Sequence, residues 1–294
     1  MERRMKALAI VLGIAILSLS LSGTRQYPLA TWLWDTQLIE HSPKEVLAFL
    51  ENQQVKALYL QLDPEMDKAT YQTFIQKANE ANIQVHALGG EPSWAQVQHR
   101  AHYREWQQWI EEYQVSCFHP SQKFAGIHLD VEPYLLPGWT REQSEWKEGY
   151  QSLIKEASHF SSETGLSFGV DIPFWWDVVL FKNQYGKGSL AKWVMEHTDF
   201  VTIMAYRNYA KGSNGMIDIT SSELNWAKEL GKPVSIAVET LPQEEKHTTF
   251  STSGLKEMQT QLNLFLRHVR HESAFGGFAI HDLSGWMRLA DKKS

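Results

Sequence analysis

The feature that most constrains the fold is a unit that recurs along the chain. Each unit is a short apolar strand, a polar residue at its end, and then an amphipathic helix. Segments such as 42–53 and 254–270 have apolar residues at three- and four-residue spacing, which is the helical period. Near-continuous apolar strands that alternate with helices predict a parallel sheet covered on both faces. The predicted strands are 31–35, 55–63, 83–89, 124–132, 166–173, 200–206, 233–239 and 278–282.

Eight such units in about 260 residues fit an α/β fold of the closed (β/α)8 TIM-barrel type, which typically takes roughly 250 residues. The alternative is a doubly wound open sheet, which would place a glycine-rich phosphate turn after the first strand. Residues 32–42 (WLWDTQLIEHS) contain no glycine. The sequence contains no linker-like segment and no change of composition that would mark a second domain. We therefore predict one barrel domain over residues 24–294.

The N-terminus has the layout of a secretory signal. Basic residues at positions 3, 4 and 6 precede an apolar run that begins at Ala7, and the small residues Ser22 and Gly23 follow it. The run is short for a membrane span, which takes roughly 20 apolar residues. We expect residues 1–23 to be a signal peptide or an uncleaved anchor, the only contact with a membrane, and the folded part to be secreted or in the cell envelope.

Composition narrows the class of partner. The net charge is −6, and Lys and Arg form no run beyond the first residues, so nucleic acid is not expected as a ligand. The chain has 12 Trp, 10 Tyr and 13 Phe, and such rings are favoured where a flat apolar face meets a ligand. Trp106 and Trp109, at helical spacing, are expected to pack their helix on the barrel. We expect a monomer without a cofactor or metal ion.

The candidate site lies at the ends of the strands, because barrel enzymes gather their active sites at the C-terminal face. In residues 126–134 (GIHLDVEPY), His128, Asp130 and Glu132 alternate with apolar residues and so share one face of a strand. An Asp at a strand end often caps the next helix, so capping is an equal alternative for Asp35 and Asp282. The remaining candidates are Trp34, Tyr134, Asp171, Trp175, Trp176, Tyr206, Arg207, Glu239, His281 and Trp286.

Carboxylates together with Trp rings suggest a carbohydrate site. Indole rings stack on sugar faces, and glycosidic cleavage needs a protonated carboxyl that donates to the leaving oxygen. Repulsion from Asp130 and loss of water at the barrel mouth are expected to raise the pKa of Glu132. The predicted function is therefore hydrolysis of an oligosaccharide or polysaccharide. Trp175 and Trp176 are adjacent in sequence, so only one of them can face the mouth.

Three segments resemble motifs of the family 18 glycoside hydrolases, the chitinase family. AGIHLDVEPY resembles the DGxDxDxE signature, DFVTIMAYRN is similar to the sixth-strand motif, and GGFAIHDLSGW is similar to the last strand. The resemblance implies that Glu132 is the general acid/base and that Asp130 orients the N-acetyl group of the substrate, which attacks the anomeric carbon. It also implies that Tyr206 hydrogen-bonds that group and that Trp286 forms the floor of the sugar site.

Departures from these motifs make the chain a distant relative. Ala125 and His128 replace the first two Asp residues of the signature. His128, as a cation or hydrogen-bond donor, is expected to leave Asp130 more firmly ionised. Arg207 replaces the Asp that follows Tyr206, which suits an anionic or differently shaped substrate. We therefore expect an N-acetylhexosamine-containing glycan rather than chitin in particular.

Four alternatives stay open at this point. Glu132 and Glu239 resemble the pair of a two-glutamate retaining glycosidase, in which Glu239 would be the nucleophile. A sugar-binding barrel without catalysis has the same fold. A metal-dependent hydrolase or deacetylase would use His128, Asp130 and His281 as ligands. Lastly, the acid row could be a buried network that only stabilises the barrel.

Overall fold

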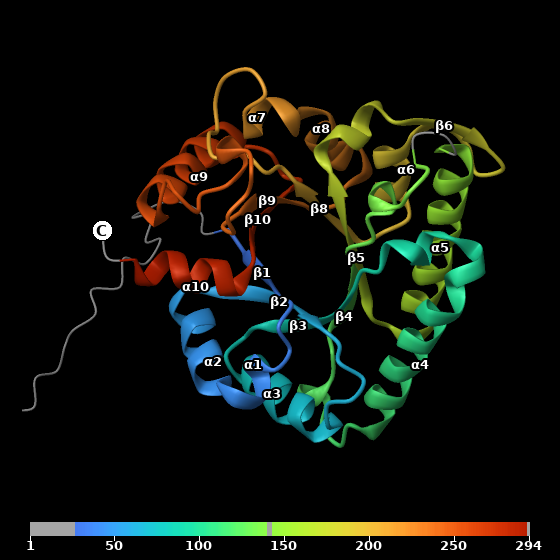
Figure 1. Cartoon of the computed structure of the whole chain (residues 1–294), viewed down its shortest axis with the longest axis vertical. Coiled ribbons are helices and arrows are strands. Elements are labelled where there is room, and N and C mark those ends of the chain that lie inside the picture. The colour runs from blue at the N-terminus through green and yellow to red at the C-terminus, as the bar shows by residue number, and fades with distance from the viewer. Residues whose placement is uncertain (1–26, 140–142, 293–294) are drawn as a thin grey trace, which may run out of the picture.

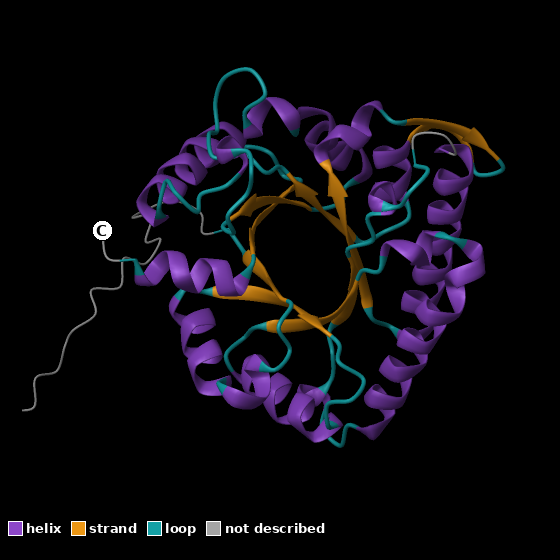
Figure 2. Ribbon diagram, viewed as in Figure 1, coloured by secondary structure: helices purple, strands orange, loops and turns teal. Residues whose placement is uncertain are grey.

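The computed structural model describes residues 27–139 and 143–292, and it confirms the predicted (β/α)8 barrel (Figures 1 and 2). Eight parallel strands close in the order β1-β10-β9-β8-β5-β4-β3-β2. The predicted signal segment 1–23 lies outside the described residues. The barrel strands are β1 (Leu29–Leu33), β2 (Val55–Gln61), β3 (Gln84–Gly89), β4 (Gly126–Leu129), β5 (Ser167–Pro173), β8 (Phe200–Met204), β9 (Val234–Glu239) and β10 (Phe275–His281).

Helices form the outer ring of the barrel (Figure 2). In the third α-helix, Asp67 caps the N-terminus by accepting a hydrogen bond from the Ala69 amide at 2.9 Å. None of these helices is long and apolar enough to cross a membrane, within the residues that the structure describes. The helices are α1 (Leu38–His41), α2 (Pro43–Asn52), α3 (Lys68–Glu80), α4 (Arg100–Ser116), α5 (Gln143–Thr164), α6 (Leu190–Glu196), α7 (Met216–Ile219), α8 (Ser221–Leu230), α9 (Leu255–Val269) and α10 (Leu283–Asp291), with short 3-10 helices η1 (Pro92–Ala95), η4 (Pro133–Leu135) and η5 (Phe174–Val178) among those between them.

Two apolar layers hold the barrel together. The larger layer lies between the strands and the helices, and the smaller one fills the barrel with side chains that include Trp32, Tyr59 and Leu88. Alternate residues of each strand point to these two layers. The inner layer is not purely apolar, because His128 and Asp171 are buried in it at 0% and 2% exposure. The interior of the barrel therefore supports the polar site at its mouth.

Two features differ from the prediction. A two-stranded antiparallel hairpin, β6 (Leu180–Asn183) and β7 (Gly186–Ser189), lies between β5 and α6. The fourth barrel strand ends at Leu129, so Asp130 and Glu132 are on the loop that follows it rather than in the strand. The two carboxyl groups consequently stand at the C-terminal mouth of the barrel.

Candidate active site

Glu132 is an acid whose pKa the fold raises. It lies directly before η4, and the hydroxyl of Tyr134 donates a hydrogen bond to its Oε1. Burial raises the pKa of Glu132, while the Tyr134 hydrogen bond and nearby His281 act in the opposite direction. The predicted upward direction is confirmed, and loss of water, one of its two predicted causes, is the largest contribution, whereas repulsion by Asp130 is not among the causes. A raised pKa makes the carboxyl group better suited to donate a proton.

Asp130 is also shifted upward. Burial, Asp171 and Glu132 all raise its pKa well above the usual range for an Asp. Its Oδ1 atom is buried and accepts no hydrogen bond within the described part of the chain. The expectation that Asp130 is firmly ionised is therefore wrong, because burial and a second buried carboxyl raise its pKa by more than the nearby His281 lowers it.

His128 is a neutral support beneath the site. Its ring is fully buried and stacks on Tyr59 at 3.7 Å between centroids, and its Nε2 lies 2.9 Å from Asp171 Oδ1. Burial lowers its pKa to about 3, so the imidazole does not supply the predicted positive charge. The other Asp171 oxygen accepts a hydrogen bond from Trp32 Nε1 at 2.9 Å. His128 and Asp171 were predicted to bind substrate, but both lie below the surface that a substrate can reach.

A hydrogen-bonded row crosses the opposite side of the mouth. Glu239, at 2% exposure, accepts two backbone N–H groups on Oε1, and on Oε2 it accepts Gln243 at 3.2 Å and His281 Nδ1 at 3.0 Å. Trp34 Nε1 donates to His281 Nε2 at 3.0 Å. Burial lowers the pKa of His281, but Glu239, Asp130 and Asp282 raise it by more. Because Trp34 donates to Nε2, this hydrogen bond competes with a second proton on His281.

Tyr206 and Trp175 add aromatic side chains to the mouth, whereas Trp176 lies beneath it. Tyr206 is half-buried with its ring 5.9 Å from His281, and burial, Asp130 and Glu239 raise its pKa, so its hydroxyl stays a donor. Trp175 is half-buried beside Tyr134, with ring centroids 5.1 Å apart. Trp176 is fully buried and packs on Tyr150. Of the two adjacent tryptophans, Trp175 is therefore the one that can stack on a sugar.

Two predicted site residues have structural roles instead. Trp286 is in α10 at 1% exposure and packs against Phe49 of α2, so it does not form the floor of the site. Arg207 donates to the Asn214 carbonyl at 3.0 Å, the Asn214 side chain at 3.1 Å and the Tyr206 carbonyl at 2.7 Å. Its guanidinium also lies over Phe174. Arg207 therefore stabilises the loop after β8 instead of binding an anionic substrate.

The capping alternative is decided for one of the two Asp residues for which it was open. Asp282 caps α10, because its Oδ1 accepts a hydrogen bond from the Gly285 amide at 2.7 Å. It also lies close enough to His281 to raise the pKa of that imidazole. Asp35 is exposed and lies directly before the turn that precedes α1.

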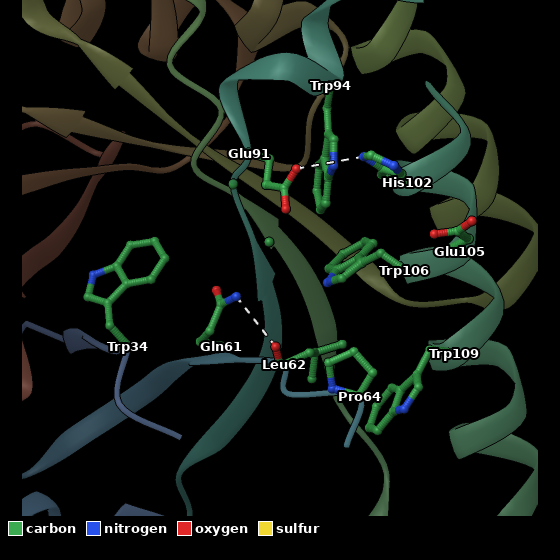
Figure 3. Close-up of a pocket in the computed structure, with 12 residues that line it drawn as sticks. Trp34, Gln61, Leu62, Pro64, Glu91, Trp94, His102, Glu105, Trp106 and Trp109 are labelled. Atoms are coloured by element: carbon green, nitrogen blue, oxygen red, sulfur yellow. Dashed lines mark hydrogen bonds and ion pairs between the residues drawn. The ribbon is translucent and has the colours of Figure 1, made fainter. Parts of the chain in front are cut away.

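Sequence reasoning missed a large pocket beside this site (Figure 3). It measures about 780 Å³. Trp106 and Trp109 do pack α4 on the core as predicted, but they also line this pocket. Trp32 was missed as well, although it lies two residues before Trp34 and so shares its strand face. The residues lining the pocket are Trp34, Gln61, Leu62, Pro64, Gly89, Gly90, Glu91, Trp94, His102, Glu105, Trp106 and Trp109.

The arrangement does not favour the metal-dependent alternative. No group of three or more His, Cys, Asp or Glu side chains is placed to hold a metal ion within residues 27–139 and 143–292. His128 faces Asp171 inside the barrel, whereas His281 pairs with Glu239 on the other side of the mouth. Two of the three proposed ligands, His128 and His281, thus already pair with different carboxyl groups.

Comparison with solved structures identifies the fold. The chitinase from Chromobacterium violaceum ATCC 12472 has a TM-score of 0.53 and 11% identity, with 92% of this chain and 100% of that chain covered. A family 18 chitinase from Pseudoalteromonas aurantia has a TM-score of 0.54 and 13% identity, with 87% and 93% covered. A family 18 chitinase mutant from Cycas revoluta, in complex with (GlcNAc)4, has a TM-score of 0.53 and 12% identity, with 90% and 97% covered.

No protein-family model matches the chain, and no curated protein matches it in sequence. Identities of this size show a shared fold and carry nothing about activity. The chain has the barrel fold of the family 18 chitinases, as the motifs of its fourth, sixth and last strands predicted.

Proposed function

We propose that this chain is a glycoside hydrolase that cleaves a glycan containing N-acetylhexosamine, with Glu132 as general acid/base. The observation that carries the proposal is the environment of Glu132 at the mouth of the barrel. Its pKa is raised by burial, and Tyr134 fixes one of its oxygens. Such an acid can protonate a glycosidic oxygen and then, as a carboxylate, activate water. The (GlcNAc)4 bound by a structural neighbour supports this substrate class.

The substrate's own N-acetyl group acts as the nucleophile in this proposal. Its carbonyl oxygen attacks the anomeric carbon while Glu132 protonates the departing oxygen. Asp130 Oδ1, which has no partner within the described residues, accepts the amide N–H. That hydrogen bond, and the positive charge that develops on the acetamido group, favour the ionised form of Asp130. Asp171 keeps the proton that the pair shares, and the Tyr206 hydroxyl donates to the acetamido oxygen.

Glu239 fits a positioning role better than that of a nucleophile. Each of its oxygens already accepts two hydrogen bonds, from Thr240, Leu241, Gln243 and His281. An attack on a sugar would require the carboxylate to give up some of these bonds. Instead, Glu239 holds His281, which in turn accepts from Trp34.

We also propose that the enzyme acts outside the cytoplasm. The support for this is the order of basic, apolar and small residues at the N-terminus, which is typical of a secretory signal. A glycan of the cell surface or surroundings is the substrate that such a location provides.

The test is hydrolysis of labelled oligosaccharides and peptidoglycan by the full-length chain. Glu132→Gln is the critical variant, and Glu145→Gln on the exposed side of α5 is the matched control. We expect cleavage only where the reacting sugar is N-acetylated, with a loss of about 10²- to 10⁴-fold in Glu132→Gln and no change in the control. Cleavage of fully de-N-acetylated chains would contradict the role of the N-acetyl group and favour Glu239 as the nucleophile. Sugar binding without turnover would contradict the proposed hydrolase and indicate a sugar-binding barrel without catalysis.

A further inference from the structure

The pocket beside the reaction site is directly continuous with it. Trp34 lines the pocket and also donates to His281 in the site. Gly90 lines the pocket as well, and a Cβ atom placed there would lie 2.4 Å from the Asp130 carbonyl oxygen. Its volume of about 780 Å³ is within the range of ordinary small-molecule sites. A glycan unit bound here would be a neighbour of the unit that reacts at Glu132.

The walls of this pocket are indole rings with unused polar atoms. Trp34 is on one side, and Trp94, Trp106 and Trp109 are on the other, with Gln61 between them (Figure 3). Trp94 is only 4% exposed, and its Nε1 has no hydrogen-bond partner within the described chain. Trp106 Nε1 and Gln61 Oε1 are also buried atoms without a partner within the described chain, although both residues are only half-buried as a whole. Buried donors and acceptors without partners destabilise a protein, so these atoms favour a ligand rich in hydroxyl and amino groups.

The charge of the pocket selects among such ligands. Glu91 and Glu105 stand among its lining residues, and within residues 27–139 and 143–292 the lining contains no Lys or Arg. Among these described residues the other titratable lining residue is His102, whose Nδ1 lies 4.0 Å from Glu91. Ser93 donates a hydrogen bond to Glu91 at 3.4 Å. Indole faces attract cations, and carboxylates do so more strongly. An anionic unit would be repelled here, and a cationic unit would gain more from the two carboxylates than a neutral unit, which can only hydrogen-bond to them.

The outer end of the pocket already attracts an ammonium group from the protein itself. The Lys68 Nζ lies 5.6 Å from the centroid of the Trp109 ring, and Glu112 holds it at 3.1 Å. Lys68 is not among the residues that line the pocket, so its charge remains outside. One indole face and one carboxylate thus already hold an ammonium group at this end of the pocket.

We propose that this pocket binds a hexosamine unit with a free, positively charged amino group. The ammonium would lie between the indole faces and the carboxylates of Glu91 and Glu105, and the sugar hydroxyls would reach the indole N–H groups and Gln61. The natural substrate is then a partly de-N-acetylated glycan, in which an N-acetylated unit reacts beside a charged one. The identity of the reacting unit rests on the proposed function, but binding in the pocket does not depend on turnover.

The test is calorimetric affinity of full-length Glu132→Gln for three probes of equal length: oligosaccharides of glucosamine, of N-acetylglucosamine and of glucose. We expect a chain that carries glucosamine to bind more tightly than the glucose probe, with an affinity that falls as salt is added. Adding Glu91→Gln and Glu105→Gln weakens glucosamine binding by about fivefold and leaves the glucose probe unchanged. Glu111→Gln, exposed on the same helix as Glu105, is the matched control and changes neither affinity.

Both substituted carboxylates are exposed, so the variants are expected to fold. Equal affinity for charged and neutral probes, or an unchanged affinity in the double variant, would overturn the proposal and leave a neutral sugar site. A charge-dependent affinity together with no hydrolysis of any substrate would uphold this pocket and refute the hydrolase. Hydrolysis of N-acetylated chains without any preference for glucosamine would uphold the hydrolase and refute the proposal for this pocket.

Discussion

The imidazole of His128 lies 2.9 Å from the carboxyl group of Asp171, and both side chains are enclosed in the barrel. Since burial lowers the pKa of His128 to about 3, the ring is neutral and does not balance the charge of an ionised Asp171. Burial raises the pKa of Asp171 well above its usual range, and the Trp32 N–H bond opposes this. Asp130 and Asp171 therefore behave as two carboxyl groups that resist ionising together.

Asp171→Asn is expected to lower the pKa of Asp130. The amide keeps an acceptor for Trp32 Nε1, but it removes the negative charge that repels ionised Asp130. The measurement is the ¹³C chemical shift of the Asp130 carboxyl group during a pH titration, assigned by its absence in Asp130→Asn. A midpoint at a lower pH than in the wild type is expected. An unchanged midpoint would show that Asp171 does not share a proton with Asp130.

Tyr134→Phe is expected to move the alkaline limb of the pH profile to higher pH. The Tyr134 hydroxyl stabilises the ionised form of Glu132, so its removal raises the pKa of that acid further. Because Glu132 must be protonated to react, kcat/KM falls as the pH rises through this pKa. The profile of kcat/KM against pH is compared with that of Tyr209→Phe, a tyrosine on the loop after β8. A limb that stays in place, or moves to lower pH, would contradict the role of Tyr134.

Glu239→Gln is expected to reduce turnover by about tenfold to a hundredfold, which is the loss of one hydrogen bond to a charged group. The variant keeps the size of the side chain but no longer holds His281 with a carboxylate. Steady-state kinetics on an N-acetylated oligosaccharide give the comparison with Glu132→Gln. A loss as large as that of Glu132→Gln, with a covalent glycosyl-enzyme detectable by mass spectrometry in the wild type, would identify Glu239 as a nucleophile instead.

Glu223→Gln is expected to stabilise the protein, and by more at higher pH. Glu223 is fully buried in α8, neither of its oxygens has a hydrogen-bond partner within the described residues, and burial raises its pKa from 4.5 to about 8. Between these two values the unfolded chain ionises and the folded chain does not, so wild-type stability falls as the pH rises, by about 1.4 kcal/mol for each pH unit.

The variant has no such loss, so the difference in free energy of unfolding between the two proteins grows from pH 4.5 up to about 8 and is constant below 4.5. Urea denaturation at several pH values measures it. A difference that does not depend on pH would show that Glu223 has an ordinary pKa in the folded protein.

The barrel itself could be predicted because its strands are long apolar runs separated by helical periods. The hairpin of β6 and β7 could not, because its four-residue strands are largely exposed and have no apolar alternation. The end of β4 was placed three residues too late, since Val131 continues the apolar pattern although the strand stops at Leu129. Alternating apolar residues indicate burial, and they occur in buried loops as well as in strands.

The site was predicted in part for a related reason. Glu132, Asp130 and Tyr206 are at strand ends, where topology alone brings them together. Trp286 was misplaced because it is on a helix, where the face it turns to the core decides its direction. The pocket could not be predicted from the sequence, because Trp94, Trp106 and Trp109 come from η1 and α4. Whether these side chains lie close together depends on how the two elements pack.

Two neighbouring glycines determine which parts of this site can change over evolutionary time. A Cβ atom on Gly89 would lie 2.6 Å from Trp94, and one on Gly90 would lie 2.4 Å from the Asp130 backbone, so neither position tolerates a side chain without moving the pocket or the acid. Glu91, the next residue, is exposed and free to vary. A lineage of such proteins can therefore acquire a new glycan preference at the rim while its reaction chemistry is inherited unchanged.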